Sequence, residues 1–434
     1  MNYLSTRNNK KEYSFGEAVI KGLSDDGGLF LPQEIPILSA EFINTIEDKS
    51  LTEIAYEISN LFINDIPGDE LRFIINETIN FPAPVVSLSD KYSVLELFYG
   101  PTCAFKDYGA RFLAGVLSRY LKAENKRCTI LVATSGDTGS AVAGGFYGKD
   151  NVDVAILYPS GKVSRIQEQQ LTTFGKNIYA FEIEGTFDDC QRLVKSAFAD
   201  KVLNKEYFLT SANSINIGRL LPQTFYYFNA WKQVKKLDKE IVFSVPSGNL
   251  GNLTAGLIAK KMGLPVKYFV SALNSNDVFL KYLDTGTFIP VPSIRTISNA
   301  MDVGNPSNLE RIIYLYKGLT ELIKNDIHAF SFDDNEIKGA MNEIFTEFNY
   351  IMDPHGAVGY LAAKKDNGSS VNGCHYIILE TAHPAKFQDE TDSLISNRII
   401  LPHQLKKSLN KKKHSVKISK KYLEFKECLI KTIF

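Results

Sequence analysis

Residues 129–141 read TILVATSGDTGSA, and this stretch decides the class of fold. Its first five residues, 129–133, are apolar or β-branched and predict a buried strand, which a Gly-rich turn and a helix through Ala143 follow. A strand, a tight turn and a helix in succession begin a βαβ unit, whose strands run parallel. The stretch therefore predicts an α/β protein with mostly parallel sheets flanked by helices.

The same alternation continues along the chain. A helix is predicted over 163–174, and a second Gly-rich turn precedes a helix that runs to Met262. Further strands are predicted at 152–158, 177–183, 241–245, 266–272 and 376–379. Ligands of such sheets bind beyond the carboxyl ends of the strands, which is where the polar motifs of this chain fall.

The two ends of the chain differ from this middle part. Residues 51–80 have a helical pattern, which Phe81-Pro82-Ala83-Pro84 stops because proline cannot continue a helix. We expect an N-terminal domain over 1–86, a catalytic region of two α/β subdomains over 87–400 and a basic tail over 401–434. The lysines of the tail favour a solvated helix or loop over a nucleic-acid contact.

Composition excludes several classes of function. The 434 residues carry 49 basic and 49 acidic side chains, so no overall charge favours nucleic acid or a membrane as partner, and an anionic substrate needs a local site. The five cysteines are widely spaced without a CxxC pair, which argues against disulfides and a zinc site and for a reducing compartment. No apolar run reaches the roughly 20 residues of a membrane helix. We expect a cytoplasmic protein without a metal.

One lysine stands out as a candidate for covalent chemistry. Lys106 follows Phe105 in the segment PTCAFKDYGARF (101–112), shortly after the apolar run 94–98. Such a lysine is either a surface residue with a buried stem, or one whose amine forms an imine with an aldehyde, the usual attachment of pyridoxal phosphate (PLP).

Two Gly-rich turns offer backbone N–H groups to anions. The first is ATSGDTGSA (133–141), where Thr134, Ser135 and Thr138 add hydroxyl donors, and the second is VPSGNLGN (245–252). Neither fits a nucleotide-binding consensus. A simple capped turn explains one glycine and one hydroxyl, but not this density. Two anion sites and an imine lysine suit a phosphorylated cofactor and an anionic substrate.

Two further polar segments follow predicted elements. SANSINIGRLLPQ (211–223) contains Asn213, Ser214 and Arg219, which would bind a second phosphate or, alternatively, cap a helix. In ETAHPAKF (380–387), Thr381 follows a strand, where its hydroxyl would meet a ring nitrogen or serve as a turn residue.

At these five motifs the sequence resembles the bacterial and fungal threonine synthases, a branch of the fold-type II PLP enzymes with a tryptophan synthase β-like fold. The resemblance covers most of the chain and keeps the motifs in the family's order. YLSTR (3–7) and DGGLFLP (26–32) look like the extra N-terminal domain of this family.

The resemblance implies a role for each motif. Lys106 would hold PLP, Phe105 would lie beside its ring and Thr381 would hydrogen-bond its pyridine nitrogen. Asp137 falls where many relatives have an asparagine near the 3′-oxygen, and we assign it no contact with the cofactor. The cofactor phosphate would be bound by Ser247, Gly248, Asn249, Leu250 and Gly251, the substrate carboxylate or phosphate by Thr134, Ser135 and Thr138, and the substrate phosphate by Asn213, Ser214 and Arg219.

The implied reaction converts O-phospho-L-homoserine and water to L-threonine and phosphate, by γ-elimination and then β-addition of water, in a monomer or homodimer. A threonine dehydratase or O-acetylserine sulfhydrylase is an alternative, but neither needs the phosphate site that Arg219 predicts. Others are a phospholyase that does not add water correctly and a non-catalytic ligand-binding protein, against which Lys106 argues.

Overall fold

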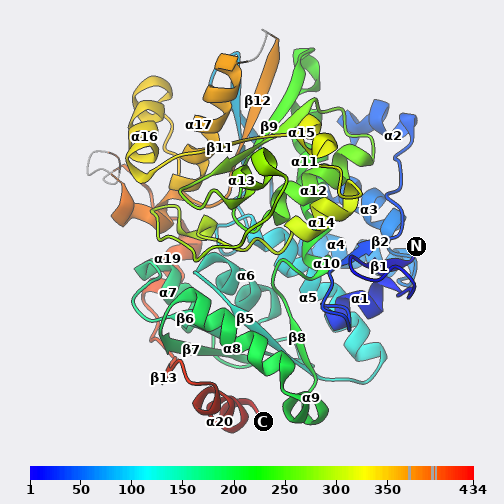
Figure 1. Cartoon of the computed structure of the whole chain (residues 1–434), viewed down its shortest axis with the longest axis vertical. Coiled ribbons are helices and arrows are strands. Elements are labelled where there is room, and N and C mark those ends of the chain that lie inside the picture. Colours follow the sequence, from blue (N-terminus) through cyan, green and yellow to red (C-terminus); the bar gives the residue numbers. More distant parts are fainter. Residues whose placement is uncertain (370–372, 392–394, 396–397) are drawn as a thin grey trace.

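The computed structural model describes residues 1–369, 373–391, 395 and 398–434, and its described strands form three sheets (Figure 1). One sheet has the order β13-β7-β6-β5-β8, and every pairing in it is parallel. Its strands are β5 (Cys128–Ala133), β6 (Val152–Pro159), β7 (Ile178–Glu184), β8 (Leu209–Ser211) and β13 (Val416–Ser419).

The second sheet has the order β11-β10-β9-β12-β4-β3 and is parallel except where β3 meets β4. Its strands are β3 (Val85–Ser87), β4 (Tyr92–Glu96), β9 (Glu240–Pro246), β10 (Tyr268–Leu273), β11 (Ile327–Ser331) and β12 (Cys374–Glu380). The prediction of mostly parallel sheets is confirmed.

Helices cover both sheets (Figure 1). Those near the five-stranded sheet are α5 (Lys106–Ala123), α6 (Asp137–Phe146), α7 (Arg165–Thr172), α8 (Phe187–Ala199), α9 (Lys201–Glu206), α19 (His403–Leu409) and α20 (Tyr422–Ile433). The others are α10 (Ile217–Leu220), α11 (Gln223–Val234), η2 (Lys235–Leu237), α12 (Gly251–Lys261), α13 (Val278–Thr285), η3 (Asn299–Met301), α14 (Leu309–Leu315), α15 (Thr320–Asp326), α16 (Asp334–Phe348), α17 (Pro354–Ser369) and η4 (Pro384–Glu390).

The N-terminal part forms a small unit that packs on α5 and α11. It contains β1 (Tyr3–Ser5), α1 (Phe15–Lys21), β2 (Phe30–Pro32), α2 (Ala40–Thr45), η1 (Ile46–Asp48), α3 (Leu51–Phe62) and α4 (Gly68–Thr78), with β1 and β2 antiparallel. The continuous helical pattern expected over 51–80 is wrong. Pro67 interrupts it and lies at the N-cap of α4, since proline supplies no N–H for a helix interior.

The basic tail also differs from the expectation of a solvated helix or loop. Residues 416–419 form β13, which pairs with β7 and completes an edge of the five-stranded sheet. α20 then packs on α8 and β13, with Phe425 and Leu429 buried. The four residues of β13 do not alternate clearly between exposed and buried positions. Pairing with β7, and not the sequence pattern of β13 itself, therefore determines that this segment is a strand.

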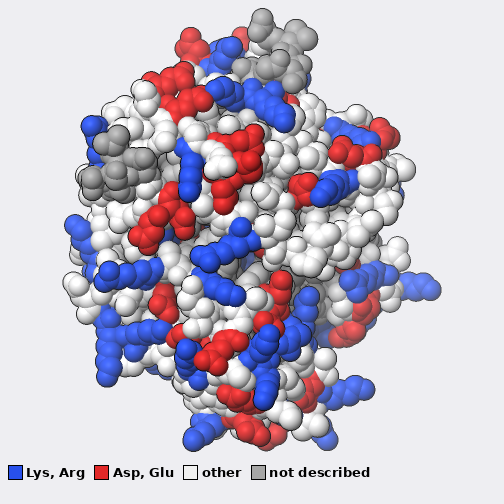
Figure 2. Space-filling view, turned by 60° about the vertical axis from the view of Figure 1, so that its left-hand side comes forward, with Lys and Arg blue, Asp and Glu red and all other residues white. Residues whose placement is uncertain are grey.

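Positive and negative side chains intermingle over the face in Figure 2, in keeping with the equal numbers of basic and acidic residues. Among the described helices, none has both the length and the apolar character needed to cross a bilayer. A large buried core joins the N-terminal unit to α5, α11 and α12 and runs onto both sheets, so the site between the sheets has a rigid support.

Candidate active site

Lys106 lies at the start of α5, where the chain meets the end of β12. Ala104 forms an isolated bridge with Ala382, and the N–H of Phe105 donates to the carbonyl of Thr381 at 2.8 Å. Lys106 Nζ lies 4.5 Å from the centroid of the Phe105 ring. The backbone pairing therefore brings Lys106, Phe105 and Thr381 together, although the sequence separates Thr381 from the lysine by most of the catalytic region.

The environment of Lys106 favours its neutral amine. Burial, and then the nearby Arg219 guanidinium, lower the pKa of Lys106 to about 8, while the Asp137 carboxylate acts in the opposite direction. A lysine with a lowered pKa is a competent nucleophile and general base near neutral pH. Lys106 is half-buried, and its lowered pKa distinguishes it from an ordinary surface lysine.

The second Gly-rich turn connects β9 to the N-terminus of α12. Gly248 packs so tightly that a Cβ there would lie 2.7 Å from Met301 Cα, and Leu250 is buried with a left-handed φ of 58°. This conformation is costly for leucine and points to a functional constraint. The N–H of Ser247 is engaged by the carbonyl of Ala272 at 2.8 Å, so the unengaged donors begin after it, at the start of α12. A helix N-terminus reached by such a turn fits the phosphate of PLP.

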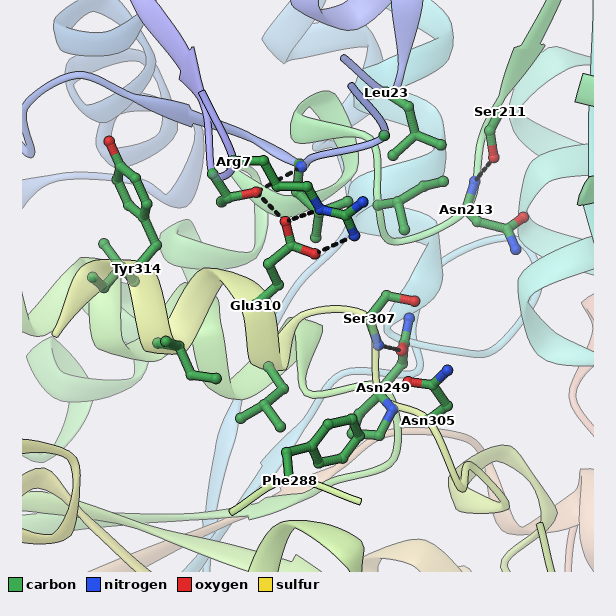
Figure 3. Close-up of a pocket in the computed structure, with 18 of the residues that line it drawn as sticks. Arg7, Leu23, Ser211, Asn213, Asn249, Phe288, Asn305, Ser307, Glu310 and Tyr314 are labelled. Carbon is green, nitrogen blue, oxygen red and sulfur yellow. Dashed lines mark hydrogen bonds and ion pairs between the residues drawn. The ribbon is translucent and has the colours of Figure 1, made fainter. Parts of the chain in front are cut away.

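Asn249 joins this turn to the segment of residues 211–219, which we call the substrate loop. Its Nδ2 donates to Ser214 Oγ at 2.5 Å. Its Oδ1 accepts from the N–H of Ser307 at 2.6 Å (Figure 3). The two loops that we assign to two different phosphates are thus in direct contact. Asn213, Ser214 and Asn249 are each half-buried, which leaves room for a ligand beside them.

The substrate loop carries two buried polar atoms that form no hydrogen bond with the described residues. Arg219 is buried and donates from Nη1 to the carbonyl of Ala212 at 2.5 Å, but among the described residues its Nε and Asn213 Oδ1 have no hydrogen-bond partner. Burial lowers the pKa of Arg219 to about 10. Gly109 of α5 allows the close approach, since a Cβ there would lie 2.7 Å from the carbonyl oxygen of Arg219. A buried guanidinium with an unused donor is suited to bind an anion.

The first Gly-rich turn is shaped by Thr134. Its Oγ1 accepts from the N–H groups of Gly136 at 2.9 Å and Gly139 at 2.8 Å, which caps the start of α6. Ser135 and Thr138 stand half-buried beside this cap. Thr134 thus has a local structural role, and the prediction that Thr134, Ser135 and Thr138 bind the substrate stays a prediction.

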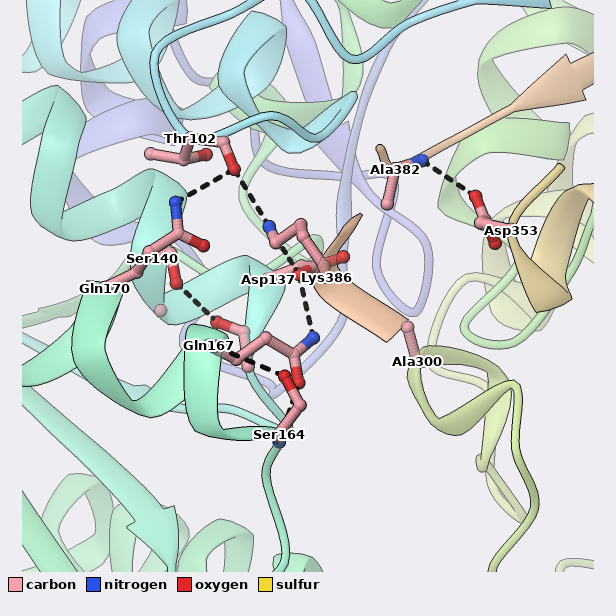
Figure 4. Close-up of polar contacts among 12 residues, drawn as sticks. Thr102, Asp137, Ser140, Ser164, Gln167, Gln170, Ala300, Asp353, Ala382 and Lys386 are labelled. Carbon is pink, nitrogen blue, oxygen red and sulfur yellow. Dashed lines mark hydrogen bonds and ion pairs between the residues drawn. The ribbon is translucent and has the colours of Figure 1, made fainter. Parts of the chain in front are cut away.

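Asp137 is paired with Lys386, a residue without a role in the sequence-based assignment. Its Oδ1 accepts from Lys386 Nζ at 2.7 Å and from Gln167 Nε2 at 2.9 Å, and Lys386 also donates to the carbonyl of Thr102 at 2.9 Å (Figure 4). Burial opposes ionisation of Asp137, but the Lys386 ammonium prevails and lowers the pKa of this carboxyl. ETAHPAKF contains Lys386, but only the tertiary contact reveals its partner.

A second buried network flanks Thr381. Asp353 accepts from the N–H of Ala382 at 3.2 Å (Figure 4). It also pairs with His355 Nδ1 at 2.6 Å, and its own N–H donates to Glu380 Oε1 at 2.7 Å. His355 Nε2 accepts from the N–H of Ala300, so Nδ1 carries the proton. Burial, then the Asp353 carboxylate, raise the pKa of Glu380 well above its usual range. These residues, which the sequence analysis missed, hold both neighbours of Thr381.

A pocket of about 1100 Å³ opens beside the substrate loop (Figure 3). Asn213 and Asn249 line it, whereas Lys106, Ser214 and Arg219 are not among the described residues that do so. Arg7 of the N-terminal unit closes one wall through a two-pronged contact with Glu310 of α14, at 3.0 and 2.9 Å. The N-terminal unit and α14 therefore both contribute to the wall of this pocket.

Comparison with known families and structures agrees with this geometry. Family models match residues 2–79 (Threonine synthase N terminus), 83–376 (Pyridoxal-phosphate dependent enzyme) and 356–428 (Threonine synthase, C-terminal). The threonine synthase of Serratia marcescens is 42% identical over 407 residues, which cover 93% of each chain. That of Escherichia coli K12 is 42% identical over 93% of this chain and 94% of its own.

Solved structures are similar over the whole chain. The crystal structure of Escherichia coli threonine synthase has a TM-score of 0.92 at 39% identity and covers 99% of this chain and 100% of its own. The PLP-bound threonine synthase of Brucella melitensis has a TM-score of 0.91 at 34% identity, over 99% and 98%. These matches confirm the fold-type II class with an extra N-terminal domain, and the chain belongs to the threonine synthase family of pyridoxal-phosphate-dependent enzymes.

Proposed function

We propose that this protein converts O-phospho-L-homoserine and water to L-threonine and phosphate. The observation that carries the proposal is the buried Arg219, whose Nε is unused in the described structure and whose charge acts on Lys106. A fold-type II enzyme needs one phosphate site for its cofactor. A second cationic site beside the lysine suits a substrate with a phosphate of its own.

When bound, PLP supplies the electron sink that stabilises negative charge at the substrate Cα. Lys106 would hold the cofactor, with Phe105 beside the ring and Thr381 Oγ1 at the pyridine nitrogen, and Ser247–Gly251 would bind the cofactor phosphate. Once released by the substrate amine, Lys106 is the general base for the Cα proton, and its lowered pKa suits that task.

The substrate loop would act on the leaving group. Arg219, Asn213 and Ser214 would bind the phosphate on Cγ and stabilise the charge that develops on it as the C–O bond breaks. Ser135 and Thr138 would hold the substrate carboxylate, at a turn that Thr134 shapes. A second proton leaves Cβ as the phosphate departs from Cγ, and Cγ is then protonated. The hydroxyl of water adds at Cβ, and Lys106 returns a proton to Cα and releases threonine.

The test is to supply O-phospho-L-homoserine and measure phosphate and threonine together. Equal yields support the synthase, whereas phosphate with a 2-oxo acid supports a phospholyase. Arg219→Ala should bind PLP like the wild type and lose about 30- to 1000-fold in kcat/KM, because a charge-assisted contact to a buried anion is worth about 2–4 kcal/mol.

Arg219→Lys is the matched variant and should recover part of the loss, since lysine keeps the charge but not the planar fork. Inhibition by free phosphate should weaken in parallel in Arg219→Ala. A variant that loses affinity for PLP, yet keeps its substrate kinetics once saturated with PLP, would mean that the two phosphate sites are assigned the wrong way round.

We also propose the division into residues 1–86, 87–400 and 401–434, which the family boundaries near residues 79–83 support at its first step. The five separate cysteines, none of them disulfide-bonded, favour a reducing cytoplasm as its compartment. A monomer or homodimer remains our proposal for the assembly.

A further inference from the structure

Arg311 of α14 is a fully buried guanidinium whose four described partners are all neutral oxygens. Nε donates to the carbonyl of Phe30 at 3.1 Å, Nη1 to the carbonyl of Ser214 at 3.1 Å and to Asn308 Oδ1 at 2.7 Å, and Nη2 to the carbonyl of Ile215 at 2.6 Å. A buried charge without a carboxylate is costly to keep, so its position needs an explanation.

These contacts close a ring that joins both phosphate loops. Arg311 reaches Asn308, whose Nδ2 donates to the carbonyl of Asn249 at 3.0 Å, and Asn249 Nδ2 in turn reaches Ser214 Oγ at 2.5 Å. Arg311 completes the ring at the carbonyl of Ser214. A Cβ at Gly251 would lie 3.4 Å from both Asn308 Nδ2 and Ser214 Cβ, so the cofactor loop, the substrate loop and α14 converge here.

We propose that Arg311 is a positioning residue, which holds the substrate loop at a fixed distance from the cofactor-phosphate turn by binding the loop's carbonyls. This inference rests on the proposed function of the loop. Because Arg311 takes the carbonyls of Ser214 and Ile215, the Ser214 hydroxyl is held against Asn249 and beside the pocket that Asn249 lines. The bond to Phe30 ties the same arrangement to strand β2 of the N-terminal unit.

The positive charge adds to this geometric role. Two buried guanidiniums bind backbone carbonyls of the substrate loop. Arg219 donates to the carbonyl of Ala212, and Arg311 donates to those of Ser214 and Ile215. The carboxylates of Asp107 and Glu310 act on Arg219 and Arg311 from nearby. The described hydrogen bonds of both guanidiniums nevertheless go to neutral oxygens, so their charge favours a phosphate dianion over a neutral group beside the loop.

A double-mutant cycle of Arg311→Met with Ser214→Ala tests the coupling. In the wild type, Ser214→Ala should raise both the KM for O-phosphohomoserine and the inhibition constant of inorganic phosphate about tenfold, as expected for one hydrogen bond to an anion. In the Arg311→Met background, Ser214→Ala should raise the KM and the inhibition constant of phosphate by less than about threefold, because the Ser214 hydroxyl is no longer held in position. Arg311→Lys should recover part of the coupling.

Tyr316→Phe is the control, because it removes a part-buried hydrogen bond just after α14, from Tyr316 Oη to Asp326 Oδ2, and neither partner belongs to the substrate loop. It should lower the free energy of unfolding. Ser214→Ala should raise the KM and the inhibition constant of phosphate by the same factor in the Tyr316→Phe background as in the wild type. If Arg311→Met does not fold, Asn308→Ala replaces it, since it cuts the ring between Arg311 and Asn249.

Fully additive effects of Arg311→Met and Ser214→Ala would overturn the positioning role and leave the proposed function standing. If Ser214→Ala and Arg219→Ala both leave KM and phosphate inhibition unchanged in the wild type, the substrate loop is misassigned. That outcome overturns the proposed function and, with it, the role of Arg311.

Discussion

Individual residues at this site combine two buried guanidiniums with a lysine whose neutral form is favoured. Arg219 and Arg311 are buried and Lys106 is half-buried, and desolvation lowers the pKa of each. Asp137, the carboxylate that acts on Lys106, is itself neutralised by Lys386. The two guanidiniums suit a reaction in which both the cofactor and the substrate carry a phosphate.

The lowered pKa of Lys106 makes a prediction about pH. An amine must be neutral to attack an aldehyde, so the rate at which the cofactor-free protein takes up PLP should rise with pH and level off above about 8, not near the ordinary lysine value of 10.5. Stopped-flow absorbance of the bound cofactor measures this rate. Lys106→Ala should fold and show no such absorbance.

Arg219→Met provides the matched change, because removing a nearby positive charge should move the midpoint to higher pH while the lysine remains in place. An unchanged midpoint in Arg219→Met, or a wild-type midpoint near 10.5, would contradict the electrostatic account of Lys106.

At the scale of elements, the sequence predicts those whose pattern is local. The six strands expected from apolar runs lie within about two residues of β5, β6, β7, β9, β10 and β12. The break at Pro67 and the strand β13 were not predicted. The break at Pro67 was missed because the residues on both sides of it have helical periodicity. Strand β13 was missed because it forms only by pairing with the edge strand β7.

The site residues likewise divide into those that a local sequence motif predicts and those that only tertiary contacts reveal. Lys106, the Gly-rich turns and the substrate loop lie in short motifs after strands, so the sequence alone brought them forward. Arg311 and Lys386 act through partners more than 90 residues away in sequence, at Ser214 and Asp137, and no local pattern marks them. Buried polar networks of this kind require the tertiary structure.

Close packing of α5 on α10 gives a prediction at this scale. Gly109→Ala should destabilise the protein by about 1–3 kcal/mol despite the better helix propensity of alanine, because the new Cβ meets the backbone oxygen of Arg219 at 2.7 Å. The displaced Arg219 should also raise the KM for O-phosphohomoserine. Denaturant titration and steady-state kinetics measure the two effects.

Gly339→Ala is the matched control in the exposed face of α16, where a Cβ meets nothing within 4 Å. It should stabilise the protein by up to about 1 kcal/mol and leave kinetics unchanged. Equal effects of the two substitutions on stability would show that contact with Arg219 does not limit residue 109.

At the scale of the whole molecule, a buried ion pair joins the two larger sheets around the site. α6 follows β5 of one sheet and η4 follows β12 of the other, and the Asp137–Lys386 pair connects them at 2.7 Å (Figure 4). The carbonyl of Thr102, in the segment that leads to Lys106, accepts from the same ammonium. One buried ion pair therefore links the two sheets and the lysine segment.

Removing one member of this pair should be more damaging than removing both. Lys386→Met leaves Asp137 buried without its cation and should lower the free energy of unfolding by about 3–5 kcal/mol, whereas the double variant Lys386→Met/Asp137→Asn should recover most of that loss. Because Lys386 lowers the pKa of Asp137, the stabilisation is present at pH values above the ordinary 3.8 and is lost as pH falls through the lowered value. Urea titrations of the three proteins at pH 7 measure the losses. A cost below about 1 kcal/mol for Lys386→Met, typical of a surface pair, would mean that other contacts join the sheets.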